Sequence, residues 1–312
     1  MTGHTGFKGS WICSWLLSLG AKVYGYSSDI PTNPSMYVLA GLDNHIEWHK
    51  GNILDVDFLC ATVSKIKPDI IFHIAAQPII SLAYTNPLQT FETNIIGTAS
   101  VLEALRKLDY TCSLVSITSD KSYLNKEWVW GYRETDELGG KDPYSASKAG
   151  AEMVLKSYFN TYFKEASDKR ISVVRAGNII GGGDWAHNRI IPDCIRAWEK
   201  NEAVIIRSPK SIRPWQHVLE PIYGYLLLAM NLYNNNKFNG EVFNFGPNAM
   251  EVKDVLTLVE KFSALIKAKG LPARVLVKEE NAFNEAEILK LNCEKALAWL
   301  GWKPVLSVNE AL

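Results

Sequence analysis

The sequence Met1-Thr-Gly-His-Thr-Gly-Phe-Lys-Gly-Ser10 places glycines at positions 3, 6 and 9, in the pattern Gly-x-x-Gly-x-x-Gly. Such spacing supplies a positive φ for a tight turn, bare N–H groups for a pyrophosphate and close helix packing. A helix-like run, Ser10–Leu19, follows, and then a short apolar strand, Ala21–Tyr26. The stretch therefore predicts the phosphate-binding turn of a dinucleotide-binding unit, although three spaced glycines also occur in ordinary loops.

Beyond this turn, strand-like and helix-like stretches alternate. Strands are expected at His45–Lys50, Asp69–Ile74, Cys112–Ile117 and Ile171–Ala176, with helices at Val56–Lys65, Thr85–Lys107 and Tyr144–Phe163. This alternation predicts an α/β fold with a doubly wound, Rossmann-type parallel sheet over residues 1–177. After residue 177 strands and helices alternate less regularly. Helices are expected at Arg189–Lys200 and Glu220–Asn235, and strands at Val204–Ile206 and Val242–Phe245. A last helix–strand–helix is expected from Val252 to Leu300. We expect residues 178–312 to form mainly a smaller C-terminal α/β lobe that binds the substrate.

The first strand of such a sheet is central and leads into the glycine turn, yet this chain begins at the turn. We therefore expect the first strand to be missing and the sheet centre to be open, with poor folding or weak cofactor binding as the consequence.

Composition excludes several classes of protein. Thirty-three basic and 33 acidic residues balance, so no net field attracts nucleic acid or a membrane surface. No apolar run reaches about 18 residues, which argues against a spanning helix. Five dispersed cysteines without a Cys-x-x-Cys pair suit reduced thiols in the cytoplasm. His45 and His49 have no acidic or cysteine partner nearby, so we expect no metal site.

The strongest chemical signal is Tyr144-Ser-Ala-Ser-Lys148. Asp142 and Pro143 fit an N-cap and a first helical residue, so Tyr144 opens a helix and Lys148 lies on the same face one turn later. An ammonium beside a phenol stabilises the phenolate, and we expect it to lower the pKa of Tyr144 toward that of a general base. Without the glycine turn, an incidental Tyr and Lys at a helix start would be the simpler interpretation.

These motifs, with Asn94-Ile-Ile-Gly97, resemble the extended short-chain dehydrogenase/reductase (NAD-dependent epimerase/dehydratase) superfamily. Longer strings resemble the CDP-glucose 4,6-dehydratases: Thr2-Gly-His-Thr-Gly-Phe-Lys-Gly-Ser10, Ala75-Ala-Gln-Pro78, Thr118-Ser-Asp-Lys121, Trp130-Gly-Tyr-Arg133, Arg175-Ala-Gly-Asn-Ile-Ile-Gly-Gly-Gly-Asp-Trp185 and Arg213-Pro-Trp-Gln-His-Val-Leu-Glu-Pro221. The resemblance covers nearly the whole chain.

The resemblance implies catalytic roles for five residues: Ser119, Asp120, Lys121, Tyr144 and Lys148. Tyr144 and Lys148 would oxidise the sugar, whereas Asp120 and Lys121 would eliminate water from it. Many sugar-nucleotide dehydratases have Asp-Glu where this chain has Asp120-Lys121. The dipeptide could equally be a solvated turn at a strand end, but its place directly after Ser119 favours catalysis.

The implied cofactor is NAD. Its expected binding residues are Gly3, Thr5, Gly6, Phe7, Lys8, Gly9, Asp29, Asn52, Ile53, Ala75, Ala76, Gln77, Asn94, Tyr144, Lys148 and Arg175. Asp29 follows the second strand, where an acidic residue binds the ribose hydroxyls of NAD. No Arg stands nearby to bind the 2′-phosphate of NADP, so NAD is favoured. Asn52 departs from the aspartate that many relatives carry. The substrate's nucleotide and sugar are expected to contact Asn178, Arg189, Arg207, Arg213 and His217, because arginine forks match phosphate geometry.

The implied reaction is dehydration of CDP-D-glucose to CDP-4-keto-6-deoxy-D-glucose, with NAD recycled, in deoxysugar or surface-polysaccharide synthesis. An epimerase, a dehydratase of another nucleotide sugar, and a non-catalytic relative or inactive fragment remain alternatives. Relatives associate through two long helices, which implies a homodimer or homotetramer.

Overall fold

The computed structural model describes residues 1–166, 168–248, 251–278 and 287–312. A parallel sheet in the order β10-β5-β4-β3 forms its centre. The strands are β3 (Ile70–His73), β4 (Cys112–Ile117), β5 (Lys169–Ala176) and β10 (Val242–Phe245). A second parallel pair, β1 (Tyr24–Ser27) with β2 (Glu47–Lys50), lies beside it. All six residues of β4 are buried, as expected for a strand covered on both faces.

The expectation of an open sheet centre is wrong, because Met1 to Gly3 lies between β1 and β3. The Thr2 N–H donates to the Phe72 carbonyl at 3.0 Å, and the Tyr26 N–H donates to the Met1 carbonyl at 2.8 Å. Thr2 thus bridges both strands in parallel. These contacts fix the glycine turn at the carboxyl edge of the sheet.

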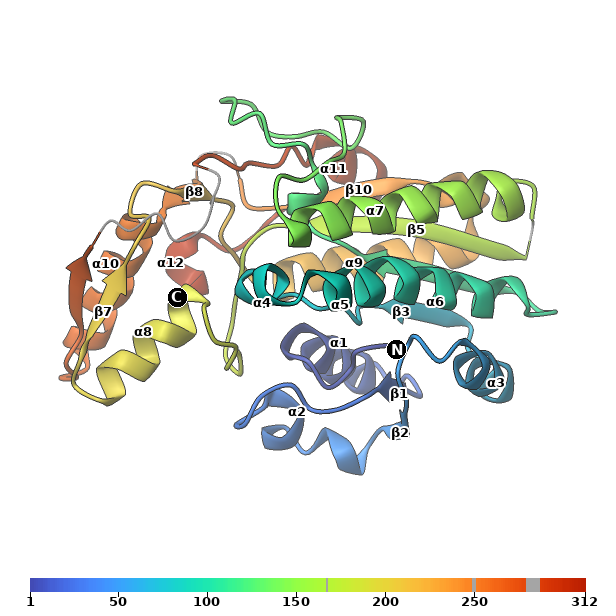
Figure 1. Cartoon of the computed structure of the whole chain (residues 1–312), viewed down its shortest axis with the longest axis horizontal. Helices are drawn as coiled ribbons and strands as arrows, with labels where there is room; N and C mark the ends of the chain where they lie inside the picture. Colours follow the sequence, from blue (N-terminus) through green and yellow to red (C-terminus); the bar gives the residue numbers. More distant parts are fainter. Residues whose placement is uncertain (167, 249–250, 279–286) are drawn as a thin grey trace.

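Helices cover both faces of the sheet (Figure 1). One face packs against α1 (Phe7–Ser18) and α9 (Leu219–Asn234), with Val115 and Ile117 of β4 in that core. The other face packs against α3 (Val56–Ile66), α6 (Gly97–Arg106) and α7 (Pro143–Tyr158), with Leu114 of β4 in a separate core. The period-two alternation of β4 therefore builds both hydrophobic layers.

A smaller lobe lies beside the carboxyl edge of the sheet (Figure 1). It contains α8 (Ile190–Glu199), β7 (Ala203–Ile206), α10 (Val255–Ala268) and β12 (Arg274–Val277), and β12 pairs with β7 in parallel. The lobe has its own core, in which Trp198 and Phe262 are buried. The remaining elements are short: α2 (Met36–Leu39), η1 (Leu42–Asn44), α4 (Ile80–Thr85), α5 (Pro87–Phe91), η2 (Glu92–Ile96), η3 (Asp120–Ser122), η4 (Phe159–Phe163), β6 (Ile179–Ile180), β8 (Ile212–Arg213), β9 (Gln216–His217), η5 (Asn236–Phe238), β11 (Lys253–Asp254), α11 (Glu294–Leu300) and α12 (Val308–Ala311).

Two features differ from the sequence expectation. Val242–Phe245 pairs with β5 and belongs to the main sheet, so residue 177 is not a boundary of that sheet. The helix expected over Thr85–Lys107 begins at Pro87 and contains the π-helical turn η2, and α4 precedes it. Strand pairing across about 65 residues of sequence has no local signature, and neither has a π turn inside a periodic helix.

Among the described residues, no helix combines the length and apolarity needed to cross a membrane. The same part of the chain holds no group of three or more His, Cys, Asp or Glu side chains placed to bind a metal ion.

Candidate active site

One large cavity, with a volume of about 620 Å³, opens between the carboxyl edge of the sheet and the smaller lobe. This volume is typical of pockets that hold small molecules and cofactors. We call five lining residues the floor: Ser119, Asp120, Lys121, Tyr144 and Lys148. We call five others the roof: Asn178, Asp184, Arg189, Arg207 and Arg213.

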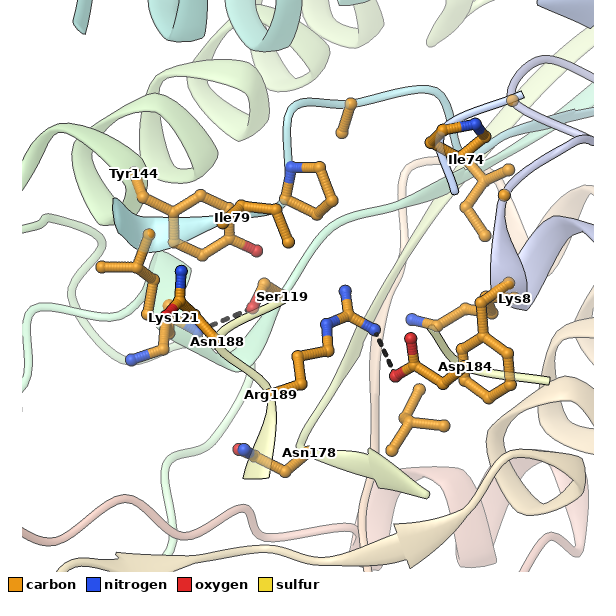
Figure 2. A pocket seen from close by; sticks show the side chains of 18 of the residues that line it. Lys8, Ile74, Ile79, Ser119, Lys121, Tyr144, Asn178, Asp184, Asn188 and Arg189 are labelled. Atoms are coloured by element: carbon orange, nitrogen blue, oxygen red, sulfur yellow. Dashed lines mark hydrogen bonds and ion pairs between the residues drawn. The ribbon is translucent and has the colours of Figure 1, made fainter. Parts of the chain in front are cut away.

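Two local structures build the floor. Strand β4 ends at Ile117, and Ser119 caps the short helix η3, where its hydroxyl accepts from the Lys121 N–H at 3.2 Å and donates to Asp120 Oδ1 at 3.0 Å. Helix α7 begins at Pro143 after the N-cap Asp142, whose Oδ1 accepts from the Ser145 N–H at 3.0 Å. This start places Tyr144 and Lys148 on one buried face of α7. The Tyr144 ring extends toward Ser119 (Figure 2).

The expected lowering of the Tyr144 pKa is wrong for the ligand-free protein. Burial raises the pKa of Tyr144 to about 12, although a hydrogen bond with Ser119 opposes the shift. Burial also lowers the pKa of Lys148 to about 8, while the Glu152 carboxylate opposes that change. The desolvation cost of a phenolate therefore outweighs the opposing effects of Ser119 and Arg189.

Asp120 is suited to carry a proton. Its side chain is buried, and Oδ2 has no hydrogen-bond partner among the described residues. Burial raises the pKa of Asp120, whereas Lys121, Ser119, Arg213 and Lys8 pull it down. A raised carboxyl pKa in a cleft is the arrangement that general acid catalysis needs.

The glycine turn lies at one end of the cavity. Gly3 has φ +68°, and a Cβ there would meet the Ala75 backbone at 2.7 Å. A Cβ on Gly9 would lie 2.3 Å from the Gly3 carbonyl oxygen, whereas one on Gly6 would meet only that oxygen, at 3.5 Å. Packing thus requires glycine at positions 3 and 9, while Gly6 leaves room for a ligand. Helix α1 has no acidic residue in its first turn, so its N–H groups of Phe7 and Lys8 can face an anion.

Further expected cofactor residues line the same cavity. Thr5 donates its hydroxyl to the Asp29 carbonyl at 2.6 Å, which fixes the end of β1 against the turn, and the Ser28 hydroxyl donates to Asp29 Oδ1 at 2.9 Å. The other lining residues of this group are Asn52, Ile53, Ala75 and Ala76. Their placement suits an extended dinucleotide that runs from Asp29 across the turn to the floor.

Three expected cofactor residues lie outside the lining of this cavity. The Gln77 N–H donates to Asn94 Oδ1 at 2.8 Å, and Asn94 Nδ2 donates to the Ser147 hydroxyl at 2.8 Å, so this pair braces the loop after β3 against α7. Arg175 is buried in an ion pair with Glu152. Its side chain is therefore engaged behind the floor.

The roof closes the other end of the cavity. Arg189 Nη1 donates to Asp184 Oδ2 at 3.0 Å, and its side chain extends across the cavity toward Lys8 (Figure 2). Arg213 is buried, Arg207 is exposed, and both line the cavity with Asn178. These residues bring three guanidinium groups to the cavity, and that of Arg189 lies on the side of Lys8.

His217 is half-buried and lies outside the cavity lining. Its Nδ1 accepts from the Leu219 N–H at 3.3 Å, and its ring packs edge-on to Trp11, 6.2 Å between centroids. Asp184 and Asn188 also line the cavity, although neither is among the site residues expected from the sequence. Asn188 has φ +60° and donates to the Ser81 hydroxyl at 2.9 Å, which ties the roof to α4. The sequence around Asn188 carries no clear signal of this contact, because its φ is known only from the structure.

A family model described as GDP-mannose 4,6 dehydratase matches residues 1–312. The chain belongs to this family. It is similar to the CDP-glucose 4,6-dehydratase of Salmonella typhimurium, with 46% identity over 100% of this chain and 87% of that relative. It is also similar to the CDP-paratose 2-epimerase of Salmonella typhi, with 24% identity over 100% of this chain and 96% of that relative.

Two solved structures have the same fold. The UDP-glucose 4-epimerase of Thermotoga maritima superposes with a TM-score of 0.84 at 23% identity, over 99% of this chain and 94% of that one. The dTDP-glucose 4,6-dehydratase of Bacillus anthracis superposes with a TM-score of 0.80 at 21% identity, over 99% and 92%. The resemblance drawn from the motifs and the Rossmann-type fold class are thereby confirmed.

Proposed function

We propose that this chain is a CDP-glucose 4,6-dehydratase that uses NAD and forms CDP-4-keto-6-deoxy-D-glucose and water. The observation that carries the proposal is the floor, where a Tyr–Lys pair and a buried Asp120, whose carboxyl pKa is raised by burial, face one cavity. An epimerase needs ketone formation but no acid to expel a hydroxyl group. The 46% identical relative is a CDP-glucose 4,6-dehydratase, which supports the same substrate.

The glycine turn and the end of β1 would hold NAD. The bare backbone at Gly6 and the N-terminus of α1 suit the pyrophosphate, and Asp29 suits the ribose hydroxyls. No Arg lies among the cavity-lining residues near Asp29, which supports NAD over NADP. Bound NAD would accept hydride from C4, return it to C6, and bring positive charge near Tyr144.

The floor residues divide the chemistry between them. Tyr144, hydrogen-bonded to Ser119, would remove the proton of the C4 hydroxyl, and Lys148 would stabilise the phenolate. The resulting 4-ketone acidifies the C5 proton. Asp120 would protonate the departing C6 hydroxyl, and Lys121, on the same short helix η3, would accept the C5 proton as a neutral amine.

The roof suits the nucleotide part of the substrate. Arg189, Arg207 and Arg213 bring positive charge to the cavity, as two phosphates require. Asn178 lines the same cavity and suits a sugar hydroxyl (Figure 2). In this proposal residues 1–177 serve mainly the cofactor and residues 178–312 mainly the substrate.

An apolar face supports self-association. Leu88 of α5, Ile96 of η2 and Met153 of α7 are 75%, 55% and 55% exposed, and α5 and α7 contact each other. Exposed apolar side chains on neighbouring helices suit a homodimer or homotetramer. We place this enzyme in the cytoplasm, in deoxysugar synthesis.

Incubation with NAD and either CDP-glucose, UDP-glucose or GDP-mannose tests the proposal. We expect a 4-keto-6-deoxy sugar from CDP-glucose, detected by NMR, and a weaker reaction when NADP replaces NAD. A 4-epimer without loss of water would favour the epimerase, and no product from any sugar would favour a binding protein.

A further inference from the structure

A buried ion pair lies directly behind the floor, on α7 and β5. Arg175 Nε donates to Glu152 Oε1 at 2.8 Å and to Oε2 at 2.9 Å, and Nη2 also donates to Oε2. The Arg175 and Glu152 residues are only 2% and 4% exposed. Several parallel donor–acceptor contacts fix the orientation of the carboxylate as well as its charge.

Other groups hold Arg175 away from the cavity. Its guanidinium lies over the ring of Tyr123, 4.5 Å from the centroid, and Nη1 donates to the Glu134 carbonyl at 3.2 Å. Tyr123 is itself fixed, since its hydroxyl donates to Asn244 Oδ1 at 2.8 Å. Arg175 is therefore saturated by protein partners.

Glu152 faces the catalytic residues from behind. It follows Lys148 by one helical turn on α7, so both lie on the same side of the helix. The Thr118 hydroxyl donates to Glu152 Oε1 at 2.7 Å, and Thr118 lines the cavity directly before Ser119. One carboxylate thus joins Arg175, the cavity wall and the catalytic face of α7.

Among the charges around Lys148, that of Glu152 favours the protonated form of Lys148. Lys8 of the glycine turn is cationic in part, since burial lowers its pKa to about 7. His73 of β3 is neutral, because burial lowers its pKa to about 3, and Tyr144 is neutral near pH 7. The Glu152 carboxylate is the group that opposes the loss of the Lys148 proton.

We infer that Glu152 is a positioning residue that keeps Lys148 charged on the floor, and that Arg175 orients Glu152 instead of binding the cofactor. The role of Lys148 itself rests on the proposed function. The electrostatic link between Lys148 and Glu152 is a property of the ligand-free protein.

Competitive acetylation of the ligand-free protein across pH measures this link. Mass spectrometry gives the pH at which Lys148 is half reactive, in the parent, in Glu152→Gln and in the double variant Glu152→Gln/Arg175→Gln. We expect the midpoint to fall by about one pH unit in Glu152→Gln, since a nearby opposite charge typically shifts a pKa by that much or more. The fall should be smaller in the double variant, because loss of the Arg175 cation offsets part of the loss of the carboxylate. Glu103→Gln is the matched control, because Glu103 is ion-paired with Arg106 on α6.

Glu152→Gln alone leaves Arg175 unpaired and could prevent folding, whereas the double variant leaves no unpaired charge. An unchanged Lys148 midpoint in either folded variant would overturn the inference, as would an equal shift in Glu103→Gln. Failure of both Glu152 variants to fold would assign the pair to the fold alone and would also overturn it.

Turnover gives a second readout. Activity that needs protonated Lys148 is lost as pH rises through its pKa, so the alkaline limb of the Glu152→Gln profile should move to lower pH. If the parent does not convert CDP-glucose, the proposed function fails, while the acetylation midpoints still decide the role of Glu152.

Discussion

The floor and the roof of the cavity are built in different ways. The floor comes from a strand end and one helix turn, and Ser119, Asp120, Tyr144 and Lys148 are at most 9% exposed. The roof comes mainly from connecting segments, with Arg213 on the short strand β8. Arg207 is exposed and the Arg189 side chain is 35% exposed, whereas Arg213 is buried. Burial shifts the pKa values of Asp120, Tyr144 and Lys148, whereas the roof supplies charge to a more open wall. The difference suggests that the floor controls the chemical steps and that the roof controls substrate affinity.

Replacing the floor acid should have the largest effect. Asp120→Asn cannot protonate the departing hydroxyl, and general acid catalysis is worth about a hundredfold to ten-thousandfold in rate. We expect reduced nicotinamide to accumulate, visible by its near-ultraviolet absorbance, with little 6-deoxy product.

Tyr144→Phe is the matched floor variant, because it removes one hydroxyl and keeps the ring. It should show neither reduced nicotinamide nor product, since the first step fails. Turnover of Asp120→Asn at the parent rate would contradict the assignment of Asp120.

The glycine turn offers a pair of substitutions that separates packing from ligand approach. Gly9→Ala places a Cβ 2.3 Å from the Gly3 carbonyl and should lower both the melting temperature and NAD affinity, the latter about tenfold or more. Gly6→Ala meets only one protein atom, at 3.5 Å, and should weaken NAD binding with little change in melting temperature. Calorimetry with and without NAD measures both. Unchanged NAD affinity in Gly6→Ala would place the cofactor elsewhere.

A roof substitution should act on binding alone. Arg207→Gln removes one exposed charge at the cavity and should raise KM for CDP-glucose about tenfold, the worth of one charged hydrogen bond. We expect kcat to stay within about twofold. A fall in kcat with unchanged KM would contradict the division between floor and roof.

The smallest expected effect is on the melting temperature, which the buried Asp120 carboxyl should lower at alkaline pH. Burial raises the folded-state pKa of Asp120, so the stability it contributes is present below its unfolded pKa and lost as pH rises through its folded pKa. Asp120→Asn should therefore melt higher than the parent at pH 8, by roughly 2 °C, and equally at pH 3–4. Thermal scans at both pH values check this, and a lower melting temperature at pH 8 would show that Lys121, Arg213 and Lys8 outweigh burial.

The sequence indicated the floor better than the roof for a physical reason. Cys112–Ile117 was predicted with its observed bounds, and the spacing of Tyr144 and Lys148 is a local property of a helix start. The pairing of Val242–Phe245 with β5 is non-local, so the expected boundary at residue 177 missed it.

The other differences between the sequence expectations and the structure arise from burial and from side-chain partners that are distant in sequence. Arg175 was expected at the cofactor, but its role depends on Glu152, 23 positions away. The ion pair of Arg189 with Asp184 depends on the conformation of a connecting segment, which the sequence pattern does not predict. The pKa of Tyr144 depends on desolvation, which no spacing rule measures.

We propose that oxidation of C4, elimination of water across C5 and C6, and reduction of C6 all take place on one floor, without release of the cofactor. CDP-glucose deuterated at C4 distinguishes this sequence from its alternatives, with NMR and mass spectrometry of the product formed in ordinary water. We expect the deuterium at C6 and solvent hydrogen at C5. Deuterium that is lost to solvent, or that remains at C4 of an epimerised sugar, would contradict it.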